Sequence, residues 1–214
     1  MASKKILLLG GGGHCRSVLD CLLSGGEYDS IGIIERELSD VCCLGVPVVG
    51  TDEDVPRLFR EGWTHACVTL GSVGDPARRR SLLQLLRQTG FSRPPVVDPT
   101  AVIGRGAVLG ESVFVGKRAV INTGAVVGTG AIVNTGAILE HDCTVGDFAH
   151  ISPGCVLCGG VCVGENTHVG AGSVVRQQLR IGRDVMIGAG SVVVKDIPDG
   201  VKAYGNPCKI VEEL

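Results

Sequence analysis

Aliphatic residues recur at every sixth position through the C-terminal half of the chain. From Val97 to Val193, each position in this phase is Val, Ile or Leu, and no insertion shifts the phase. The residue four positions further on is usually small, and the residue directly after each aliphatic is often Gly or Asn. Such a repeat describes a coil with three flat sides, in which the aliphatic side chains fill a triangular core and Gly or Asn supplies tolerant backbone angles near the corners. The pattern predicts a parallel β-helix of about five coils.

Residues 1–95 follow a different pattern, in which short apolar runs alternate with stretches of helical spacing. Strands are expected at 4–9, 31–34, 46–49 and 65–70. Helices are expected at 14–23, 52–60 and 76–88, and Asp52 is the expected cap of the second. Strands alternating with helices indicate a small parallel sheet of the nucleotide-binding type. We therefore expect a Rossmann-like α/β domain at 1–95 and an all-β domain with a C-terminal tail at 96–214.

Antiparallel strands rich in glycine are the alternative for the second segment, but they would show a period of two residues and turns of variable length. The 33 glycines are spread along the chain, which favours many regular turns over a flexible linker.

Composition and charge narrow the classes of partner. The net charge of −2 lacks the basic excess that nucleic-acid binding requires. The apolar run at 6–9 is too short for a signal peptide or a membrane span, and no other apolar stretch is long enough to cross a bilayer. We expect a cytoplasmic protein with no membrane or nucleic-acid partner, whose ten cysteines are reduced and act as small buried hydrophobic residues.

Four consecutive glycines, Gly10, Gly11, Gly12 and Gly13, join the first expected strand to the first expected helix. Bare backbone amides at a helix N-terminus bind phosphate groups. The spacing is not that of the dinucleotide fingerprint, because Cys15 stands where the third glycine would be. The turn therefore favours the phosphates of a sugar nucleotide over a redox dinucleotide, and a purely structural turn is the alternative.

His141 lies two positions after an in-phase aliphatic residue, which places it beside a corner of the coil and outside the core. An imidazole there can accept a proton from an attacking amine or hydroxyl near neutral pH. Either neighbour, Glu140 or Asp142, can orient the ring. On spacing alone, a catalytic base and a solvated corner histidine are equally good interpretations.

His150 and His168 are eighteen residues apart, so we expect them to stack in adjacent coils. Two histidines fall short of the three or more ligands of a typical metal site, so we expect a surface or ligand contact and no metal. Cys155, Cys158 and Cys162 have no matching second pair and are expected to be small core or corner residues.

The sign of the charge changes along the repeat. Residues 97–175 carry three basic and six acidic residues, whereas 176–209 carry six basic and three acidic ones. A basic end suits a cofactor with phosphate groups such as coenzyme A, and ordinary solvated charge is the alternative.

Four stretches together resemble one family of sugar acyltransferases. They are the unbroken hexapeptide repeat, the Gly-Gly-Gly-Gly-His turn at 10–14, the segments 138–142 and 146–152, and the ending at 203–209. The resemblance covers essentially the whole chain and is to the family that contains the bacillosamine-pathway N-acetyltransferase PglD and the sialic acid O-acetyltransferase NeuD. It implies a left-handed β-helix, acetyl-CoA as co-substrate, and a homotrimer in which acetyl-CoA lies between adjacent β-helices.

The resemblance also implies individual roles. His141 is the implied general base and Asp142 its partner. The residues implied to contact acetyl-CoA are His150 and, through its backbone amide near the thioester, Gly159. Asn134 is implied to touch the sugar, and the glycine turn at 10–13 to hold the nucleotide part of the substrate.

One departure concerns the nucleotide. Family members that act on uridine-linked amino sugars often have two aspartates after the second strand, whereas this chain has Glu35 and Arg36. The identity of the nucleotide sugar is therefore open, and sialic acid is a second possible acceptor.

The expected function is acetyl-CoA-dependent N-acetylation of a nucleotide-linked amino sugar, of the UDP-4-amino-sugar type, by direct transfer without an acyl-enzyme. O-acetylation of sialic acid is the alternative within the same class. A metal-dependent enzyme of the γ-carbonic-anhydrase type would need three converging histidines, which the spacing of His150 and His168 does not supply. A non-catalytic β-helix protein is disfavoured by the histidine–acid pair at a corner.

Overall fold

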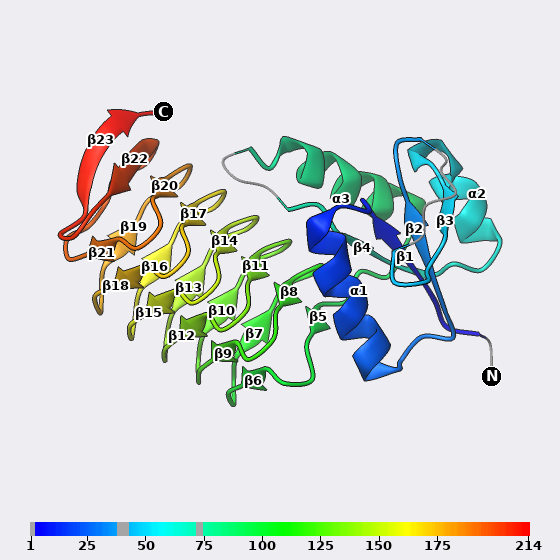
Figure 1. Cartoon of the computed structure of the whole chain (residues 1–214), viewed down its shortest axis with the longest axis horizontal. Coiled ribbons are helices and arrows are strands. Elements are labelled where there is room, and N and C mark those ends of the chain that lie inside the picture. The colour runs from blue at the N-terminus through cyan, green and yellow to red at the C-terminus, as the bar shows by residue number, and fades with distance from the viewer. Residues whose placement is uncertain (1–2, 38–42, 72–74) are drawn as a thin grey trace.

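The computed structural model describes residues 3–37, 43–71 and 75–214. An α/β domain leads into a long β-helix, and the two ends of the chain lie at opposite ends of the molecule (Figure 1). The predicted fold class, a Rossmann-like α/β domain followed by a left-handed parallel β-helix, is confirmed. The boundary predicted between residues 95 and 96 stays a prediction; the first strand of the β-helix sheets begins at Val96.

The α/β domain contains every strand and helix that the sequence pattern predicted. Its elements are β1 (Lys5–Leu9), α1 (Gly13–Gly25), β2 (Ser30–Ile34), β3 (Val48–Gly50), the 3-10 turn η1 (Asp52–Asp54), α2 (Val55–Arg60), β4 (His65–Val68) and α3 (Ala77–Thr89). The four parallel strands lie in the order β3-β2-β1-β4. The carboxyl ends of these strands meet at one edge of the sheet, where parallel α/β sheets bind their ligands.

The predicted cap of the second helix is wrong by one residue. Thr51, rather than Asp52, precedes η1, and its side chain and backbone form a capping box with Asp54. Thr51 is the cap because Asp54 lies three residues after it and accepts a hydrogen bond from the Thr51 backbone N–H. The Asp52 carboxylate accepts from Arg78 instead.

The β-helix consists of three parallel sheets, one for each side of a prism (Figure 1). The six-stranded sheet contains β6 (Val102–Ile103), β9 (Val120–Ile121), β12 (Ile138–Leu139), β15 (Val156–Leu157), β18 (Val174–Val175) and β21 (Val192–Val193). The five-stranded sheet contains β7 (Val108–Leu109), β10 (Val126–Val127), β13 (Thr144–Val145), β16 (Cys162–Val163) and β19 (Arg180–Ile181). The eight-stranded sheet contains β5 (Val96–Val97), β8 (Phe114–Val115), β11 (Ile132–Val133), β14 (His150–Ile151), β17 (His168–Val169), β20 (Met186–Ile187), β22 (Val201–Tyr204) and the antiparallel β23 (Lys209–Glu213).

Paired strands in successive coils are eighteen residues apart, so the hexapeptide phase sets the register without slips. Ile138 of β12, for example, pairs with Val156 of β15. The in-phase aliphatic residues from Val115 to Val193 are all buried in the triangular core. Each contributes about 1.5–3 kcal/mol by leaving water, an upper value that chain entropy largely offsets. In the first coil the prediction fails for Ile103, which is 38% exposed because no coil stacks below it.

The corner geometry differs from the prediction. Backbone angles in the left-handed region occur at every sixth residue, three positions after the inward aliphatic, as at Gly124 (φ 70°), Gly136 (φ 65°) and Asp142 (φ 60°). The glycines directly after the aliphatics serve another purpose. A methyl group on Gly146 would lie 2.5 Å from the backbone nitrogen of Glu165 in the next coil. Glycine is needed there because adjacent coils approach closely, not because the backbone angle is unusual.

The α/β domain packs on the eight-stranded sheet. Val18 and Leu22 of α1 share a hydrophobic cluster with Val96, Phe114 and Ile132, whose side chains point outward from that sheet. The first three strands of the sheet are therefore covered by α1, and this packing directs the N-terminus of α1 toward the strands that follow.

A second contact fixes α3 to the β-helix. The buried Arg79 guanidinium donates to the carbonyl oxygens of Gly130 and Phe148. Arg80 lies over the ring of Phe148, 4.5 Å from its centroid. The Arg80 guanidinium also donates to the Glu165 carboxylate at 3.2 Å and to Asn166 Oδ1 at 2.6 Å. These contacts set the position of α3, and with it the edge of the nucleotide-type sheet, relative to the repeat.

Within the described part of the chain, no helix has both the length and the apolar character needed to cross a membrane. The nine described cysteines are free thiols, of which Cys15, Cys21, Cys67, Cys143 and Cys155 are buried. The other four are only half-buried, so the expectation that the cysteines are core residues is correct in part. Cys42 lies outside the described residues.

Candidate functional site

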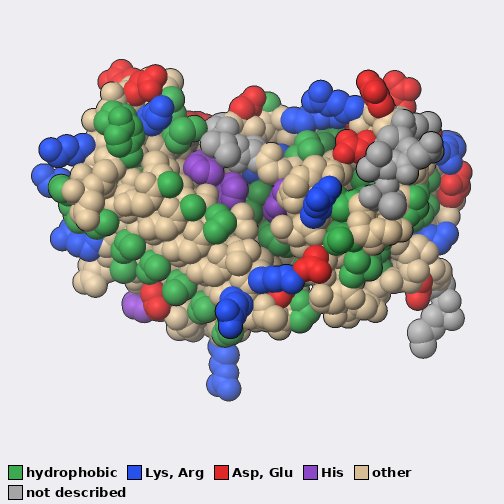
Figure 2. All heavy atoms as spheres, in the orientation of Figure 1, with side chains coloured by type: hydrophobic (Ala, Val, Ile, Leu, Met, Phe, Trp, Pro, Cys, Tyr) green, Lys and Arg blue, Asp and Glu red, His purple; other side chains and the backbone are tan. Residues whose placement is uncertain are grey.

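The predicted site residues form two groups in one chain. The corner group is His141, Asp142 and Gly159, at the corner between the six-stranded and five-stranded sheets. The sheet group is Asn134, His150 and His168, which lie on or beside the outward face of the eight-stranded sheet. Because a prism has three sides, the corner group lies across the prism from the eight-stranded sheet. Figure 2 shows histidine side chains gathered where the β-helix meets the α/β domain, and a further histidine at the opposite edge.

His141 and Asp142 form a hydrogen-bonded pair at the surface. The Nδ1 atom of His141 lies 2.9 Å from Asp142 Oδ2, and the side chains are 60% and 73% exposed. Asp142 has φ 60°, a conformation that Asp tolerates better than most residues and that turns its carboxylate back toward the ring. In the neutral tautomer whose Nδ1 donates to the carboxylate, Nε2 carries the free lone pair that a general base requires.

Glycines in the two adjacent coils make room for this pair. A methyl group on Gly159 would come within 2.4 Å of His141 Nε2, and one on Gly124 would come within 2.7 Å of Asp142 Oδ1. The backbone N–H of Gly160 donates to the His141 carbonyl at 2.9 Å. Among the described residues, no group accepts a hydrogen bond from the Gly159 N–H. The imidazole edge therefore lies against Gly159 at the corner.

Glu140 has a different partner from Asp142. The side-chain amide of Asn122, one coil earlier, donates to Glu140 Oε2 at 3.0 Å. Of the two carboxylates that the sequence offered to orient the ring, Asp142 alone is bonded to it.

Asn134 and His150 contact each other in the sheet group. The Asn134 Oδ1 atom accepts from the Thr135 N–H at 2.8 Å, which orients the amide so that its Nδ2 donates to His150 Nε2 at 3.3 Å. This contact favours the neutral tautomer of His150 with its proton on Nδ1.

The predicted stacking of His150 and His168 is present. The two residues are register partners in β14 and β17, and their rings meet edge to face with centroids 4.9 Å apart. His168 Nε2 lies 3.3 Å from Ser152 Oγ, and burial lowers the pKa of His168. In the described part of the chain, no three His, Cys, Asp or Glu side chains are grouped so that they could hold a metal ion.

His14 joins the sheet group, which the sequence reasoning did not foresee. Its ring packs edge to face on Phe114, with centroids 5.0 Å apart. Burial, together with the nearby Arg79 and His150, lowers its pKa to about 3. The signal was present in the sequence, because His14 directly follows the glycine turn; what was missing was that α1 docks on the β-helix.

The glycine turn lies at the carboxyl edge of the sheet. Gly10 has φ 108°, and its carbonyl accepts from Thr69 Oγ1 at 2.6 Å. The Gly11 N–H donates to Glu35 Oε1 at 2.6 Å. No atom of the described residues lies within 4 Å of a methyl group added to Gly12 or Gly13. The turn thus presents helix N-terminal amides beside His14, while Glu35 closes the first part of the turn.

A hollow of ≈ 170 Å³ lies beside Gly10, at the same edge of the sheet as the glycine turn. It is lined by Gly10, Ile34, Glu35, Arg36, Asp52, Leu70, Arg78 and Leu82. The features therefore follow one another in space: the hollow comes first, then the glycine turn, then His14, and last His150. An extended ligand with an anionic centre fits this series.

Comparison with known proteins gives the following matches. The family of the PglD N-terminal domain matches residues 5–86, and the bacterial transferase hexapeptide family (six repeats) matches residues 142–177. No curated protein matches the sequence.

Several solved structures match over nearly the whole chain. A point mutant of perosamine N-acetyltransferase from Caulobacter crescentus, in complex with CoA and GDP-perosamine, is 38% identical with a TM-score of 0.91, covering 98% of this chain and 97% of that one. The acetyltransferase domain of PglB from Neisseria gonorrhoeae, in complex with acetyl coenzyme A, is 34% identical with a TM-score of 0.91, covering 98% of this chain and 100% of that one. WeeI from Acinetobacter baumannii, at 24% identity and a TM-score of 0.85, shares the fold.

Proposed function

Because the chain belongs to the family of PglD-type sugar acetyltransferases and is an acyltransferase, we propose that it transfers the acetyl group of acetyl-CoA to the amine of a nucleotide-linked amino sugar. The observation that carries the proposal is the exposed His141–Asp142 pair, in which His141 Nε2 lies against Gly159 of the next coil. The nucleotide sugar of the perosamine enzyme and the CoA of both relatives support this substrate pair.

The proposed reaction is a direct displacement. His141 Nε2 takes a proton from the sugar amine as the nitrogen attacks the thioester carbonyl, and Asp142 stabilises the imidazolium that forms. The Gly159 N–H donates to the oxyanion that develops on the carbonyl oxygen. Collapse of the tetrahedral species breaks the C–S bond, and CoA leaves as the thiol once it receives the proton.

The two groups of site residues suggest that the complete site needs two chains. The corner group and the sheet group lie across the prism from each other, so one chain cannot bring His141 to His150. A closed ring of copies can set the corner of one chain beside the eight-stranded sheet of the next. In the proposed site, His150 then contacts acetyl-CoA and Asn134 contacts the sugar.

A homotrimer is the proposed assembly. The outward side chains of the six-stranded sheet are all aliphatic: Val102, Val120, Ile138, Val156, Val174 and Val192. This aliphatic stripe runs the length of the prism, and two of its members, Val102 and Val174, are 59% and 37% exposed in the single chain. Burying such a stripe against further copies is favourable at about 25 cal/mol per Å² of apolar surface.

The acceptor is proposed to extend from the α/β domain to the β-helix. Its diphosphate binds the amides at the start of α1, as phosphates do at helix N-termini. Glu35 has a second carboxylate oxygen that can accept from a ribose hydroxyl, as the acidic residue after the second strand does in nucleotide-binding folds. The amino sugar then lies by His14 and Asn134.

Release of CoA thiol tests the function. The full chain is incubated with acetyl-CoA and, separately, GDP- and UDP-linked amino sugars or sialic acid. The proposal requires thiol release with an amino sugar nucleotide; release only with sialic acid would make the enzyme an O-acetyltransferase instead. His141→Ala should lower kcat by about 10²- to 10⁴-fold, whereas His65→Ala, at a histidine remote from both groups, should leave kcat unchanged.

The proposed location is the cytoplasm. The nine described cysteines are free thiols, several of them only half-buried, and such thiols persist in reducing compartments.

A further inference from the structure

We propose that Asp52 and Arg78 recognise the base of the acceptor nucleotide and that this base is guanine. The inference rests on the proposed function, because it concerns the nucleotide of the same acceptor. It starts from the hollow at the carboxyl edge of the sheet, whose polar end is formed by Arg36, Asp52 and Arg78.

The walls of the hollow suit a flat aromatic ring. Ile34, Leu70 and Leu82 supply aliphatic side chains, and Gly10 leads from the hollow to the turn where the diphosphate is proposed to bind. A base in the hollow and a diphosphate at the start of α1 would be joined by a ribose beside Glu35. The spacing of these parts follows the covalent order of a nucleoside diphosphate.

The polar end of the hollow offers an acceptor and a donor side by side. Arg78 Nη2 donates to Asp52 Oδ2, and both side chains retain exposure, 41% for Arg78 and 30% for Asp52. Guanine presents a complementary edge: the N1–H and the N2 amine donate together to a carboxylate, and O6 and N7 accept from a guanidinium. Uracil has a single N–H between two carbonyl oxygens, so it gives the carboxylate one hydrogen bond and places an acceptor against it.

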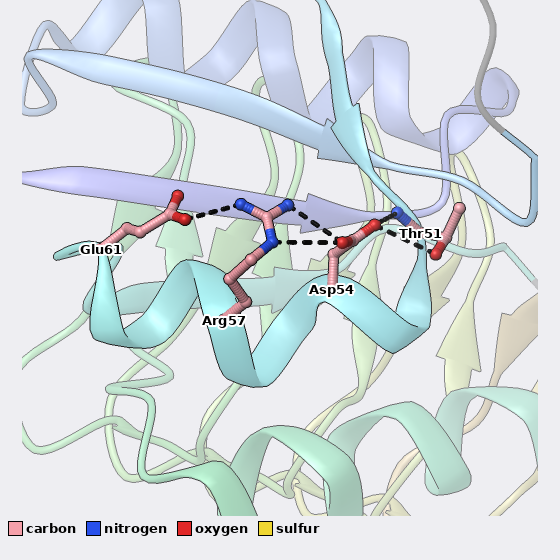
Figure 3. Close-up of polar contacts among 4 residues, drawn as sticks. All are labelled: Thr51, Asp54, Arg57 and Glu61. Atoms are coloured by element: carbon pink, nitrogen blue, oxygen red, sulfur yellow. Dashed lines mark hydrogen bonds and ion pairs between the residues drawn. The ribbon is translucent and has the colours of Figure 1, made fainter.

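Asp52 is held by a network that it does not itself belong to. Asp54 accepts from the Thr51 N–H at 2.9 Å, from Thr51 Oγ1 at 3.2 Å, and from Arg57 Nη2 at 3.0 Å (Figure 3). Arg57 also donates to Glu61 at 2.7 Å, which ties the turn to the end of α2. The hydrogen bonds that Asp54 accepts from the Thr51 N–H and from Arg57 lower the pKa of Asp54, so the turn remains intact at neutral pH. The carboxylate of Asp52 is therefore presented from a fixed turn.

Arg78 is held from the other side. It lies in the first turn of α3, and the next two residues, Arg79 and Arg80, bind the corners of the β-helix. The helix cannot shift without breaking those contacts. Both members of the pair are thus preorganised, which is the arrangement that gives selectivity between bases at a small entropic cost.

Equilibrium binding of nucleoside diphosphates to the full chain tests the inference. Calorimetry with GDP and UDP should show that GDP binds about 10- to 100-fold more tightly, as expected for one bidentate base contact. Asp52→Asn should lose GDP affinity by a similar factor and gain affinity for xanthosine diphosphate. Xanthine has a C2 carbonyl in place of the N2 amine, so it matches an amide donor where guanine does not. Glu53→Gln, in the same turn, is the matched control.

The outcomes separate this inference from the proposed function. Equal affinity of the unmodified chain for UDP and GDP overturns the inference and needs no variant. Unchanged GDP affinity in Asp52→Asn, or no gain for xanthosine diphosphate, also overturns it. Thiol release with a UDP-linked amino sugar and none with a GDP-linked one would support the acetyltransferase function and overturn the inference that the base is guanine. Tight GDP binding without acetyl transfer to any amino sugar nucleotide would support guanine recognition and overturn the proposed acetyltransferase function.

Discussion

Gly159 lies directly against the imidazole of His141, one coil away, with room for a hydrogen atom and nothing larger: a methyl group there would come within 2.4 Å of Nε2. Gly159→Ala should therefore displace the ring from its present position. Since a displacement of about 1 Å in a catalytic group costs on the order of 100-fold in rate, we expect kcat to fall by about 10- to 100-fold. Steady-state release of CoA thiol measures it.

Gly172→Ala is the control for general damage to a coil and should leave kcat unchanged, because no described residue lies near a methyl group added to this corner glycine. Its φ of 69° makes the substitution strained in the backbone alone. If Gly159→Ala retained full kcat, the proposed contact between the base and the amide would have no part in the reaction.

The separation of the two groups leads to a complementation prediction. His141→Ala and His150→Ala should each be inactive as homotrimers, for different reasons. Mixed trimers formed by unfolding and refolding the two variants together should regain activity, because some sites combine an intact corner with an intact sheet face. Random assembly gives about a quarter of such sites. Activity of the mixture no higher than that of the separate variants would show that each site is built within one chain.

Much of the molecule follows from the sequence because its constraints are local. Positions such as Val115 and Leu139 repeat every six residues, and each repeat makes the same strand and corner, so the sequence phase sets both the fold and the register. His141 is assigned to a corner by counting from Leu139 alone. The stacking of His150 on His168 follows from the same arithmetic.

What the sequence did not predict depends on packing between distant segments. No local pattern indicates that α1 docks on Phe114 and carries His14 to His150. The contact of Asp52 with Arg78 joins residues 26 positions apart on separate elements, and α3 is placed by the β-helix rather than by its own sequence. The corner angles were misassigned because glycine serves both for backbone conformation and for close approach.

The aliphatic stripe predicts the face on which chains associate. Ile138→Glu would place a charge at the centre of the stripe, where an unpaired carboxylate cannot be buried without a large penalty. We expect the trimer to dissociate, which sedimentation velocity measures directly. Val126→Glu makes the same change on the outward face of the five-stranded sheet and should leave the trimer intact; the reverse result would assign the interface to that sheet.

The depressed pKa of His14 predicts a loss of stability in acid. The imidazole has a pKa of about 3 in the folded chain and about 6.5 when unfolded. Below pH 6.5 the His14 imidazole is protonated in the unfolded state and stays neutral in the folded state. The free energy of unfolding therefore falls by at most about 1.4 kcal/mol per pH unit. His14→Gln should therefore narrow the difference in urea midpoint between pH 7 and pH 5; parallel midpoints in both proteins would contradict it.

The attachment of α3 to the β-helix predicts a selective effect on the acceptor. Arg80→Ala removes the contact with the Phe148 ring and the hydrogen bonds to Glu165 and Asn166, all at a partly exposed site. Losing about 1 kcal/mol of positioning should raise KM for the nucleotide sugar roughly 3- to 10-fold while KM for acetyl-CoA stays constant.

A shortened acceptor distinguishes positioning of the nucleotide from general damage. An amino sugar phosphate without the nucleoside makes no contact with the hollow, so Arg80→Ala and the unmodified chain should use it equally well. Gln84→Ala, on the solvent face of α3, should leave both acceptors unaffected. If the Arg80 variant instead lost the same factor with the short and the full acceptor, α3 would stabilise the fold without aligning the nucleotide with the acetyl-transfer site.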